Sequence, residues 1–172
     1  DLAMTVYVAS ASRKQLQGSD FTATCAIGRS GVIAAQDKTE GDGMSPLGCW
    51  RVRRAYWRAD RLDRPETSLV IDPIRSDDGW CDAPGDPAYN QPVRLPYPAS
   101  CETMTREDGL YDLVVVLGHN DDPPRPGLGS AIFLHCASPD FKPTEGCVAI
   151  ERSRLIELVG RLTSQDWIEI AP

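Results

Sequence analysis

The chain has 172 residues, of which 41% are hydrophobic and 25% charged, and its formal net charge is -7. This length and composition predict one soluble globular domain, residues 1–172, and exclude a disordered or fibrous chain. The mild acidity and the scattered Lys and Arg residues argue against nucleic acid or an anionic lipid surface as partner, and no apolar run approaches the roughly 20 residues of a membrane span.

Short segments rich in β-branched residues, separated by Gly, Pro and Asp clusters, predict a mainly β fold of the sandwich or barrel type. Strands are predicted at residues 4–9, 21–27, 32–36, 50–57, 68–74, 112–117, 131–135 and 167–170. The sequence AIGRSGV predicts a hairpin turn between the second and third of these strands, because Gly31 suits a positive φ. The segments DLVVVLGH and SAIFLHCA are almost continuously apolar, as expected of central strands covered on both faces.

One segment near the end of the chain predicts a helix. It starts at Ser153, which suits the N-cap position, and Leu155, Ile156, Val159 and Leu162 recur on one face at helical spacing. We expect this helix to pack on the sheet.

The segment between residues 75 and 100 is rich in Pro, Asp and Gly. An irregular stretch of this length is typical of a functional cleft wall or lid, and a surface loop tied by a disulfide fits it equally well. We expect residues 80–94 to line a ligand cleft, with Tyr89, Asn90 and Arg94 as contacts.

Six cysteines are many for a cytosolic protein of this size, and none lies in a CxxC pair. Their number favours an exported protein. The chain begins at Asp1 without a leader pattern, so we expect either a mature form whose signal was removed or a protein that was never exported. One catalytic cysteine would leave five and hence at most two disulfides, and Cys81 with Cys101 is the preferred pair because the two flank a Pro-rich stretch.

Cys147 and His135 form the pattern that most clearly indicates catalysis. A cysteine is a strong nucleophile as a thiolate, and a histidine within hydrogen-bond reach can take its proton. His135 closes an apolar strand, and the turn formed by Glu145, Gly146 and Cys147 can aim the sulfur at one point. The backbone N–H groups of Gly146 and Cys147 would then form an oxyanion hole.

Other interpretations remain open from these residues alone. His135 can be a core histidine with satisfied hydrogen bonds, and Cys147 can be a bridged or inert buried cysteine. A zinc site of His119, His135, Cys136 and Cys147 is conceivable, but these residues lack the usual ligand spacing. The spacing therefore argues against this zinc site.

The segment HCASPDFKPTEGCVAI resembles the signature of the L,D-transpeptidase (YkuD) family, in which a strand-end His is followed by a loop and a Ser/Thr-x-Gly-Cys turn. The segment KTEGDGMSPLGCW is similar to the upstream Lys-x-x-Gly-Asp-x-x-Thr-Pro-x-Gly segment of that family. It matches at Lys38, Gly41, Asp42, Ser45, Pro46 and Gly48.

The resemblance implies a β-sandwich-like catalytic domain with a cleft over the cysteine and with no cofactor and no metal. Cys147 would be the acylated nucleophile, His135 its base, and the backbone carbonyl of Cys136 the group that orients the imidazole. Thr144 and Gly146 match the turn. We interpret the upstream segment as architectural, because its Gly and Pro residues fix a loop between strands.

The implied substrates are peptidoglycan stem peptides in the periplasm, and the implied acceptor is the amino group of diaminopimelate. Hydrolysis of the thioester by water and a wall-binding domain without chemistry are the alternatives. We expect a monomer. The expected substrate contacts are Glu145, Thr144, Tyr89, Asn90, Arg94, His119 and Asn120.

Three positions depart from the family pattern. Glu145 stands where the family usually has His, Ala149 where it has Arg, and Cys136 where it has Gly. The pattern resembles a short-form subgroup from Gram-negative bacteria. Because Ala149 removes a partner for a donor carboxylate, we expect a link from the first-position L-Ala of one stem to diaminopimelate of another, with a link between two diaminopimelates as the alternative.

Overall fold

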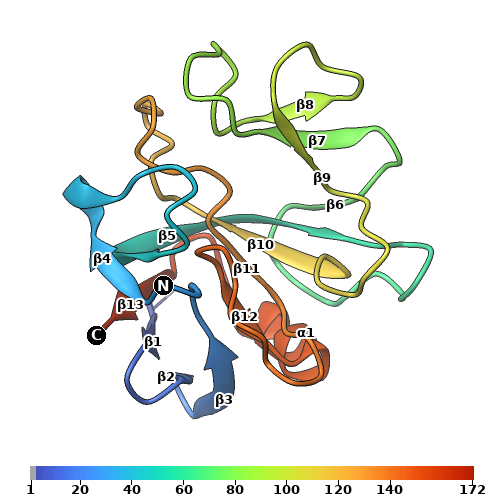
Figure 1. Cartoon of the computed structure of the whole chain (residues 1–172). Coiled ribbons are helices and arrows are strands. Elements are labelled where there is room, and N and C mark those ends of the chain that lie inside the picture. Colours follow the sequence, from blue (N-terminus) through green and yellow to red (C-terminus); the bar gives the residue numbers. More distant parts are fainter. Residues whose placement is uncertain (1–2) are drawn as a thin grey trace.

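A ten-stranded sheet that closes on itself forms the body of the molecule (Figure 1). The computed structural model describes residues 3–172, and residues 1 and 2 lie outside this description. The strands are β1 (Val6–Ser10), β2 (Gln15–Gly18), β3 (Phe21–Ala26), β4 (Val32–Ala34), β5 (Ser45–Trp57), β6 (Ile71–Pro73), β10 (Leu113–Leu117), β11 (Phe133–Cys136), β12 (Val148–Ile150) and β13 (Trp167–Ala171).

The long strand β5 closes the sheet. The remaining strands follow the order β10-β11-β12-β3-β2-β1-β13, and β5 pairs with both ends of this series. Its residues 48–51 pair with β13 and its residues 52–57 pair with β10. β4 and β6 lie alongside β5 at its two ends, and both are parallel to it. The mainly β, sandwich-like fold class is therefore confirmed.

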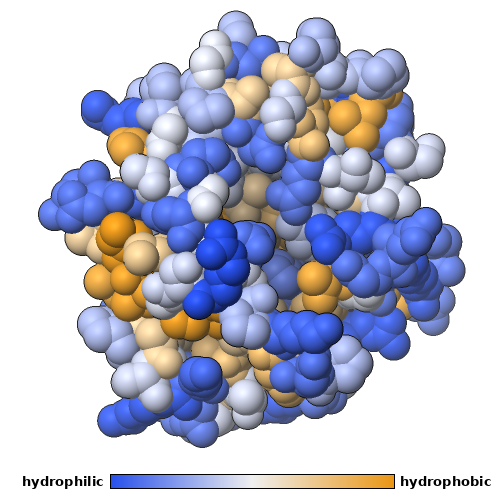
Figure 2. Space-filling view, in the orientation of Figure 1, coloured by the Kyte–Doolittle hydropathy of each residue, from blue (hydrophilic) through white to orange (hydrophobic). Residues whose placement is uncertain are grey.

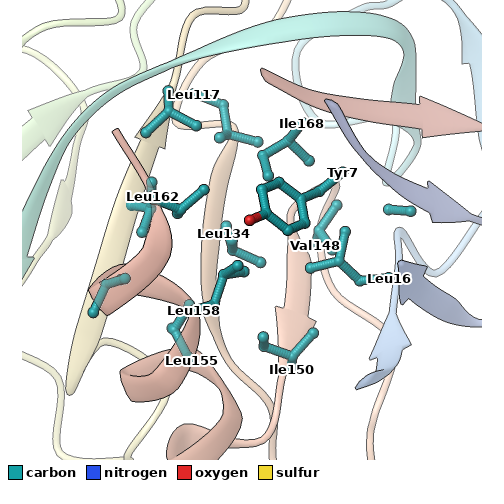
Figure 3. Packing of buried hydrophobic residues seen from close by; sticks show 14 of the residues in the cluster. Tyr7, Leu16, Leu117, Leu134, Val148, Ile150, Leu155, Leu158, Leu162 and Ile168 are labelled. Atoms are coloured by element: carbon teal, nitrogen blue, oxygen red, sulfur yellow. The ribbon is translucent and has the colours of Figure 1, made fainter. Parts of the chain in front are cut away.

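The interior of this closed sheet holds the larger hydrophobic core, which the helix α1 (Arg152–Arg161) covers. Leu155, Leu158 and Val159 of α1 are fully buried, and Figure 3 shows helix side chains meeting those of the sheet strands. Each such side chain contributes about 1.5–3 kcal/mol when buried. The predicted helix is thus confirmed, but its start is not: Ser153 lies inside the first turn, Glu151 occupies the N-cap position, and Ile156 is exposed.

A second sheet of three strands lies over the other face of β10 and β11 (Figure 1). It has the order β8-β7-β9, with β7 (Asp78–Cys81), β8 (Pro92–Arg94) and β9 (Cys101–Thr103). The ring of Trp80 in β7 meets Phe133 in β11 edge to face at 5.0 Å. The segment predicted to be an irregular excursion therefore forms most of this small sheet, and the expected burial of β10 and β11 on both faces is confirmed.

All eight predicted strands are present, with shifted ends. The predicted hairpin is wrong. Gly31 does have a positive φ of 91° and closes a turn with Gly28, but β3 and β4 do not pair with each other: β3 pairs with β2 and β12, whereas β4 pairs with β5. Long-range pairing with β5 overrides the local hairpin signal.

The six cysteines all lie within the described residues and are thiols. The expected bridge between Cys81 and Cys101 is therefore not formed, although the two residues stand directly opposite each other on β7 and β9. The helices described for residues 3–172 are too short to cross a membrane.

Candidate active site

The turn before β12 presents Cys147, and Thr144 holds this turn closed. The Thr144 hydroxyl accepts the Gly146 N–H at 3.1 Å and donates to the Cys147 carbonyl at 2.6 Å. Gly146 has a φ of 145°, and a Cβ at this position would stand 2.9 Å from the Met44 carbonyl oxygen. Only glycine therefore fits without displacing the backbone.

The upstream segment supports the same turn from behind. Ser45, which is fully buried, donates to the Gly146 carbonyl at 2.7 Å and accepts the Gly28 N–H at 2.9 Å. Asp42 accepts the Met44 N–H at 2.9 Å. These contacts agree with an architectural interpretation of the segment.

The thiol of Cys147 is held at the beginning of β11. Its sulfur accepts the Phe133 N–H at 3.3 Å and donates to the Ala131 carbonyl at 3.1 Å. Cys147 is 8% exposed. The side chain is thus nearly buried, and its proton points to a backbone oxygen.

His135 lies on the neighbouring strand, since β11 and β12 are parallel and Ala149 stands opposite His135. Its Nδ1 lies 2.9 Å from the Cys136 carbonyl. A carbonyl only accepts hydrogen bonds, so this contact assigns the proton to Nδ1 and leaves the lone pair on Nε2. The predicted contact between this carbonyl and the imidazole is present.

Burial sets the protonation of both groups. It raises the pKa of the Cys147 thiol to about 12, although the Phe133 N–H acts in the opposite direction. It lowers the pKa of His135 to about 4, against the effect of the Cys136 carbonyl. The resting pair is therefore a neutral thiol and a neutral imidazole. This corrects the expectation of a thiolate near neutral pH.

The two backbone amides proposed for an oxyanion hole differ in whether they already donate a hydrogen bond within the protein. The Gly146 N–H is engaged by Thr144, whereas the Cys147 N–H makes no hydrogen bond within residues 3–172. Cys147 therefore offers the free donor.

A cavity of about 300 Å³ opens beside Cys147. Figure 2 shows a recess near the middle of the face drawn, ringed by hydrophilic side chains. The walls of the cavity beside Cys147 come from the upstream segment, the three-stranded sheet, the chain before β11 and the cysteine turn. The lining residues are Lys38, Glu40, Gly41, Asp82, Glu102, Ser130, Ala131, Ile132, Glu145, Gly146 and Cys147. Four carboxylates against one lysine make this cavity acidic.

A second cavity of about 380 Å³ lies on the other side of the turn. His135, Ala149, Lys142 and Arg106 line it, and Glu145 lines both cavities. Arg106 is paired with Asp108. Lys142 has no ion-pair partner among the described residues. The turn that carries Cys147 thus separates an acidic cavity from one that contains a free cation.

Tyr89 and Asn90 lie behind the first cavity rather than in its lining. The Tyr89 hydroxyl donates to Glu40 at 2.6 Å. The Asn90 amide oxygen accepts the Trp80 indole N–H and the Ala131 N–H, both at 2.9 Å. Both side chains therefore position cavity walls through bonds within the protein.

The remaining expected contacts lie elsewhere. Arg94 pairs with Asp77 and Asp78 and borders a different cavity, so the structure does not bring it to Cys147. Asn120 fixes its own loop by donating to the Gly129 carbonyl at 2.9 Å.

His119 is buried beside the cavity wall. It packs edge to face on Trp50 at 4.8 Å, and its Nδ1 has no partner in the part of the chain that the structure describes. Burial lowers its pKa to about 4.

Sequence reasoning missed Glu102 and Tyr111. The Tyr111 hydroxyl donates to Glu102, and the Tyr111 ring meets the His135 ring edge to face at 5.3 Å. Neither residue stands in an apolar period or in a motif, so the sequence contains no signal for them.

Residues 3–172 contain no group of three His, Cys, Asp or Glu side chains placed to hold a metal ion. The zinc interpretation of His119, His135, Cys136 and Cys147 therefore has no support in the structure. The groups that could carry chemistry at this site are the Cys147 thiol, the His135 imidazole and the carboxylates around them.

Comparisons with known proteins show the family of the chain and its fold. A family model for the L,D-transpeptidase catalytic domain, YkuD, matches residues 4–170. The fold is similar to L,D-transpeptidase 3 from Mycobacterium tuberculosis, with a TM-score of 0.51, 13% identity, and coverage of 98% of this chain and 61% of that one. An L,D-transpeptidase from Mycobacterium smegmatis has a TM-score of 0.50 and 11% identity, with 99% and 59% covered.

A further structure of the M. tuberculosis protein, in complex with a faropenem-derived adduct, has the same TM-score of 0.51 and identity of 13%, with 98% of this chain and 60% of that chain covered. The chain thus spans about three fifths of the structures it matches. Among curated protein sequences, no significant match was found.

Proposed function

Because the chain belongs to the L,D-transpeptidase catalytic domain (YkuD) family, we propose that it is a cysteine acyltransferase that cross-links peptidoglycan stem peptides. Residues 1–172 would act as one catalytic domain, as an exported monomer in the compartment that contains peptidoglycan. The chemistry uses side chains and backbone groups and requires no cofactor.

One observation carries this proposal: Cys147 lines a cavity, and the neighbouring strand holds a neutral His135 whose Nδ1 is bonded to a backbone carbonyl. A purely structural cysteine needs neither the cavity nor the oriented imidazole. The glycine turn and its Ser45 support hold the thiol at the cavity wall.

Acylation begins when a stem peptide reaches the cavity. The sulfur attacks the carbonyl carbon that follows an L-centre, and Nε2 of His135 takes the thiol proton as the S–C bond forms. The free Cys147 N–H stabilises the oxyanion. His135 then delivers the proton to the leaving nitrogen, the C–N bond breaks, and a thioester remains on Cys147. Since the resting pair is neutral, the transfer accompanies attack and does not precede it.

The two cavities suit two different substrates. Donor stems carry carboxylates, which the Lys142 ammonium on the His135 side can attract. An acceptor amine is cationic near neutral pH, and the acidic cavity beside Cys147 favours it electrostatically. The turn at Glu145 lies between them.

We place the cross-link between the first-position L-Ala of the donor and diaminopimelate of the acceptor. Ala149 offers no cation to a donor carboxylate. Glu145, another of the three positions that depart from the family pattern, is held by Arg29 at 2.9 Å. The donor therefore depends on Lys142, which lies in the connection between β11 and β12 and not on β12 itself, and a shifted donor register follows. A link between two diaminopimelates is the alternative outcome.

Incubation of the protein with purified sacculi tests the proposal. New muropeptide dimers in the mass spectrum mean transfer, and tandem fragmentation that shows L-Ala in the bridge supports the proposed linkage. Shortened monomers alone mean that water is the acceptor and the protein is a hydrolase. Unchanged muropeptides with binding retained mean a wall-binding domain. Cys147→Ala is the control for each chemical outcome.

A further inference from the structure

Glu102 is a carboxylate of the acidic cavity that the Cys147 and His135 pair does not use. It lies in β9 and lines the same cavity as Cys147. Its neighbour in the lining, Glu40, is held by the Tyr89 and Ser130 hydroxyls at 2.6 and 2.7 Å.

Two further lining carboxylates also have partners within the protein. Asp82 accepts from Ser100 at 2.6 Å, and Glu145 is paired with Arg29. A tyrosine hydroxyl binds Glu40 and another binds Glu102, but only the tyrosine that binds Glu102, Tyr111, also contacts the ring of His135.

Tyr111 binds only one oxygen of Glu102. The hydroxyl of this buried tyrosine donates to Oε1, and the Arg106 guanidinium stands 3.9 Å from the same atom. Oε2 makes no hydrogen bond or ion pair within residues 3–172. One carboxylate oxygen is therefore fixed while the other is available to a ligand.

The same tyrosine connects Glu102 to the reacting groups. Its ring lies edge to face with His135 at 5.3 Å and with Phe133 at 5.8 Å, and the Phe133 N–H donates to the Cys147 sulfur. Glu102 and the nucleophile therefore line one cavity and are connected through the packed rings of Tyr111 and Phe133.

The charged groups that face Glu102 come from several elements. Burial raises its pKa, the Tyr111 hydroxyl and Arg106 oppose that effect, and Asp82 and Glu40 add to it. The Glu102 carboxylate in turn raises the pKa of Cys147. A carboxylate with a raised pKa is a better proton acceptor than an exposed one.

Transfer to an amine requires one proton step that hydrolysis does not. An amine arrives mostly as ammonium near neutral pH, and its nitrogen then has no lone pair with which to attack. We propose that Glu102 binds the acceptor ammonium through Oε2 and takes its proton, so that this residue determines whether the thioester reacts with an amine or with water. This inference rests on the proposed function.

The step balances as follows. One N–H bond of the ammonium breaks and its proton goes to Glu102, which becomes a neutral acid. The amine lone pair then forms an N–C bond with the thioester carbon while the C–S bond breaks. His135 carries a second proton from that nitrogen to the Cys147 sulfur, and Glu102 releases its proton to solvent. The products are the amide and the free thiol.

Glu102→Gln tests the proposal because glutamine keeps the shape and still accepts from Tyr111, yet takes no proton. Glu107→Gln is the matched control: it removes the same charge five residues away, from an exposed side chain. Wild-type and variant proteins receive stem tetrapeptides as donor and free diaminopimelate as acceptor. Intact mass measures acylation of Cys147, and chromatography measures the ratio of amide product to hydrolysed acid.

In Glu102→Gln we expect acylation within about twofold of wild type and an amide-to-acid ratio lowered at least about tenfold at about pH 6. The ratio should recover toward wild type at about pH 9, where the fraction of acceptor present as free amine is far larger than at about pH 6. Glu107→Gln should match wild type at both pH values.

Two results overturn the inference while leaving the proposed function intact. One is an unchanged ratio in Glu102→Gln. The other is a ratio lowered equally at both pH values, which a structural defect would produce. An absence of Cys147 acylation in the wild-type protein would instead overturn the proposed function, and this inference with it.

Discussion

The Cys147 thiol donates a hydrogen bond to the backbone carbonyl of Ala131 at 3.1 Å, and Asn90 holds the N–H of that same residue at 2.9 Å. The orientation of the resting nucleophile is thus set by the chain that enters β11. Ala131 has a φ of 53°, an uncommon value for a residue with a side chain. Asn90 therefore acts as a positioning residue for Cys147.

Asn90→Leu should destabilise the protein and slow acylation. The Trp80 indole N–H and the Ala131 N–H would lose their shared acceptor, and each unsatisfied buried group costs about 1–3 kcal/mol. Urea unfolding measures the first effect, and the rate of Cys147 acylation measures the second. Gln91→Leu, at the exposed neighbouring position, should change neither. Equal stability of the two variants would contradict this role for Asn90.

His135→Ala should slow acylation by about 10²- to 10⁴-fold while leaving the fold intact, because it removes the general base. His119→Ala should retain most of the rate, since His119 packs on Trp50 and does not line the cavity of Cys147. Circular dichroism checks the fold and intact mass follows the adduct. If His119→Ala alone abolished acylation, the assignment of the base would be wrong.

The free energy of unfolding should fall as the pH is lowered from about 6.5 to about 4. Burial lowers the pKa of His119 and of His135 to about 4, so in this window the unfolded chain binds protons that the folded protein does not. Glu102 acts in the opposite direction, because its folded pKa is raised.

Urea unfolding of wild type and of the double variant His119→Gln, His135→Gln separates these contributions. The chain has only these two histidines, so the difference between the two proteins isolates them. We expect the free energy of unfolding to fall less in the double variant than in wild type between about pH 6.5 and 4. Parallel curves would show that the histidines titrate normally.

The sequence predicted those parts of the molecule that depend on local patterns. Short β-branched segments between Gly, Pro and Asp clusters marked all eight expected strands, and the strand-end His135 with the turn at Cys147 indicated the candidate reactive pair, which stays a prediction. The hairpin at Gly31 failed because β5 competes for β4 over a longer range. The pKa of Cys147 was predicted in the wrong direction, since burial by Phe133 and its neighbours is not visible in the sequence.

Glu102 and Tyr111 could not be found from the sequence for a related reason. Glu102 lies in β9, outside any motif, and comes near His135 and Cys147 because the three-stranded sheet folds over β11. Tyr111 stands just before β10 and packs in the hydrophobic cluster between the two sheets. Conversely, the proline-rich loop was expected to hold the Arg94 guanidinium at the site. Arg94 instead pairs with Asp77 and Asp78 and borders another cavity.

Cys81 and Cys101 are thiols in this structure, and we expect an added oxidant to join them in a disulfide. They face each other at a site of the β7–β9 pair where flanking residues make the ladder hydrogen bonds, and such pairs have Cα separations of about 4.5 Å, within the range that a disulfide spans. Oxidised glutathione would accept the two electrons and leave as two thiols. Peptide mapping should find this bridge, and closing a loop of this length should add about 3 kcal/mol of stability.

Cys81→Ser and Cys101→Ser should each remove the bridge and its stabilisation. A bridge from Cys81 to any other cysteine, or equal stability of the oxidised and reduced proteins, would contradict this prediction.

Peptide mapping of the acyl-enzyme tests the central claim most directly. Simple alkylating reagents are a poor test, because Cys49 is the exposed thiol and reacts by access alone. A stem peptide donor must instead be positioned by the cavity, so Cys49→Ser serves as the matched control and Cys147→Ala as the negative one. The account predicts a single thioester adduct on Cys147 in wild type and Cys49→Ser, and none in Cys147→Ala; an adduct on another residue, or no adduct in wild type, would contradict it.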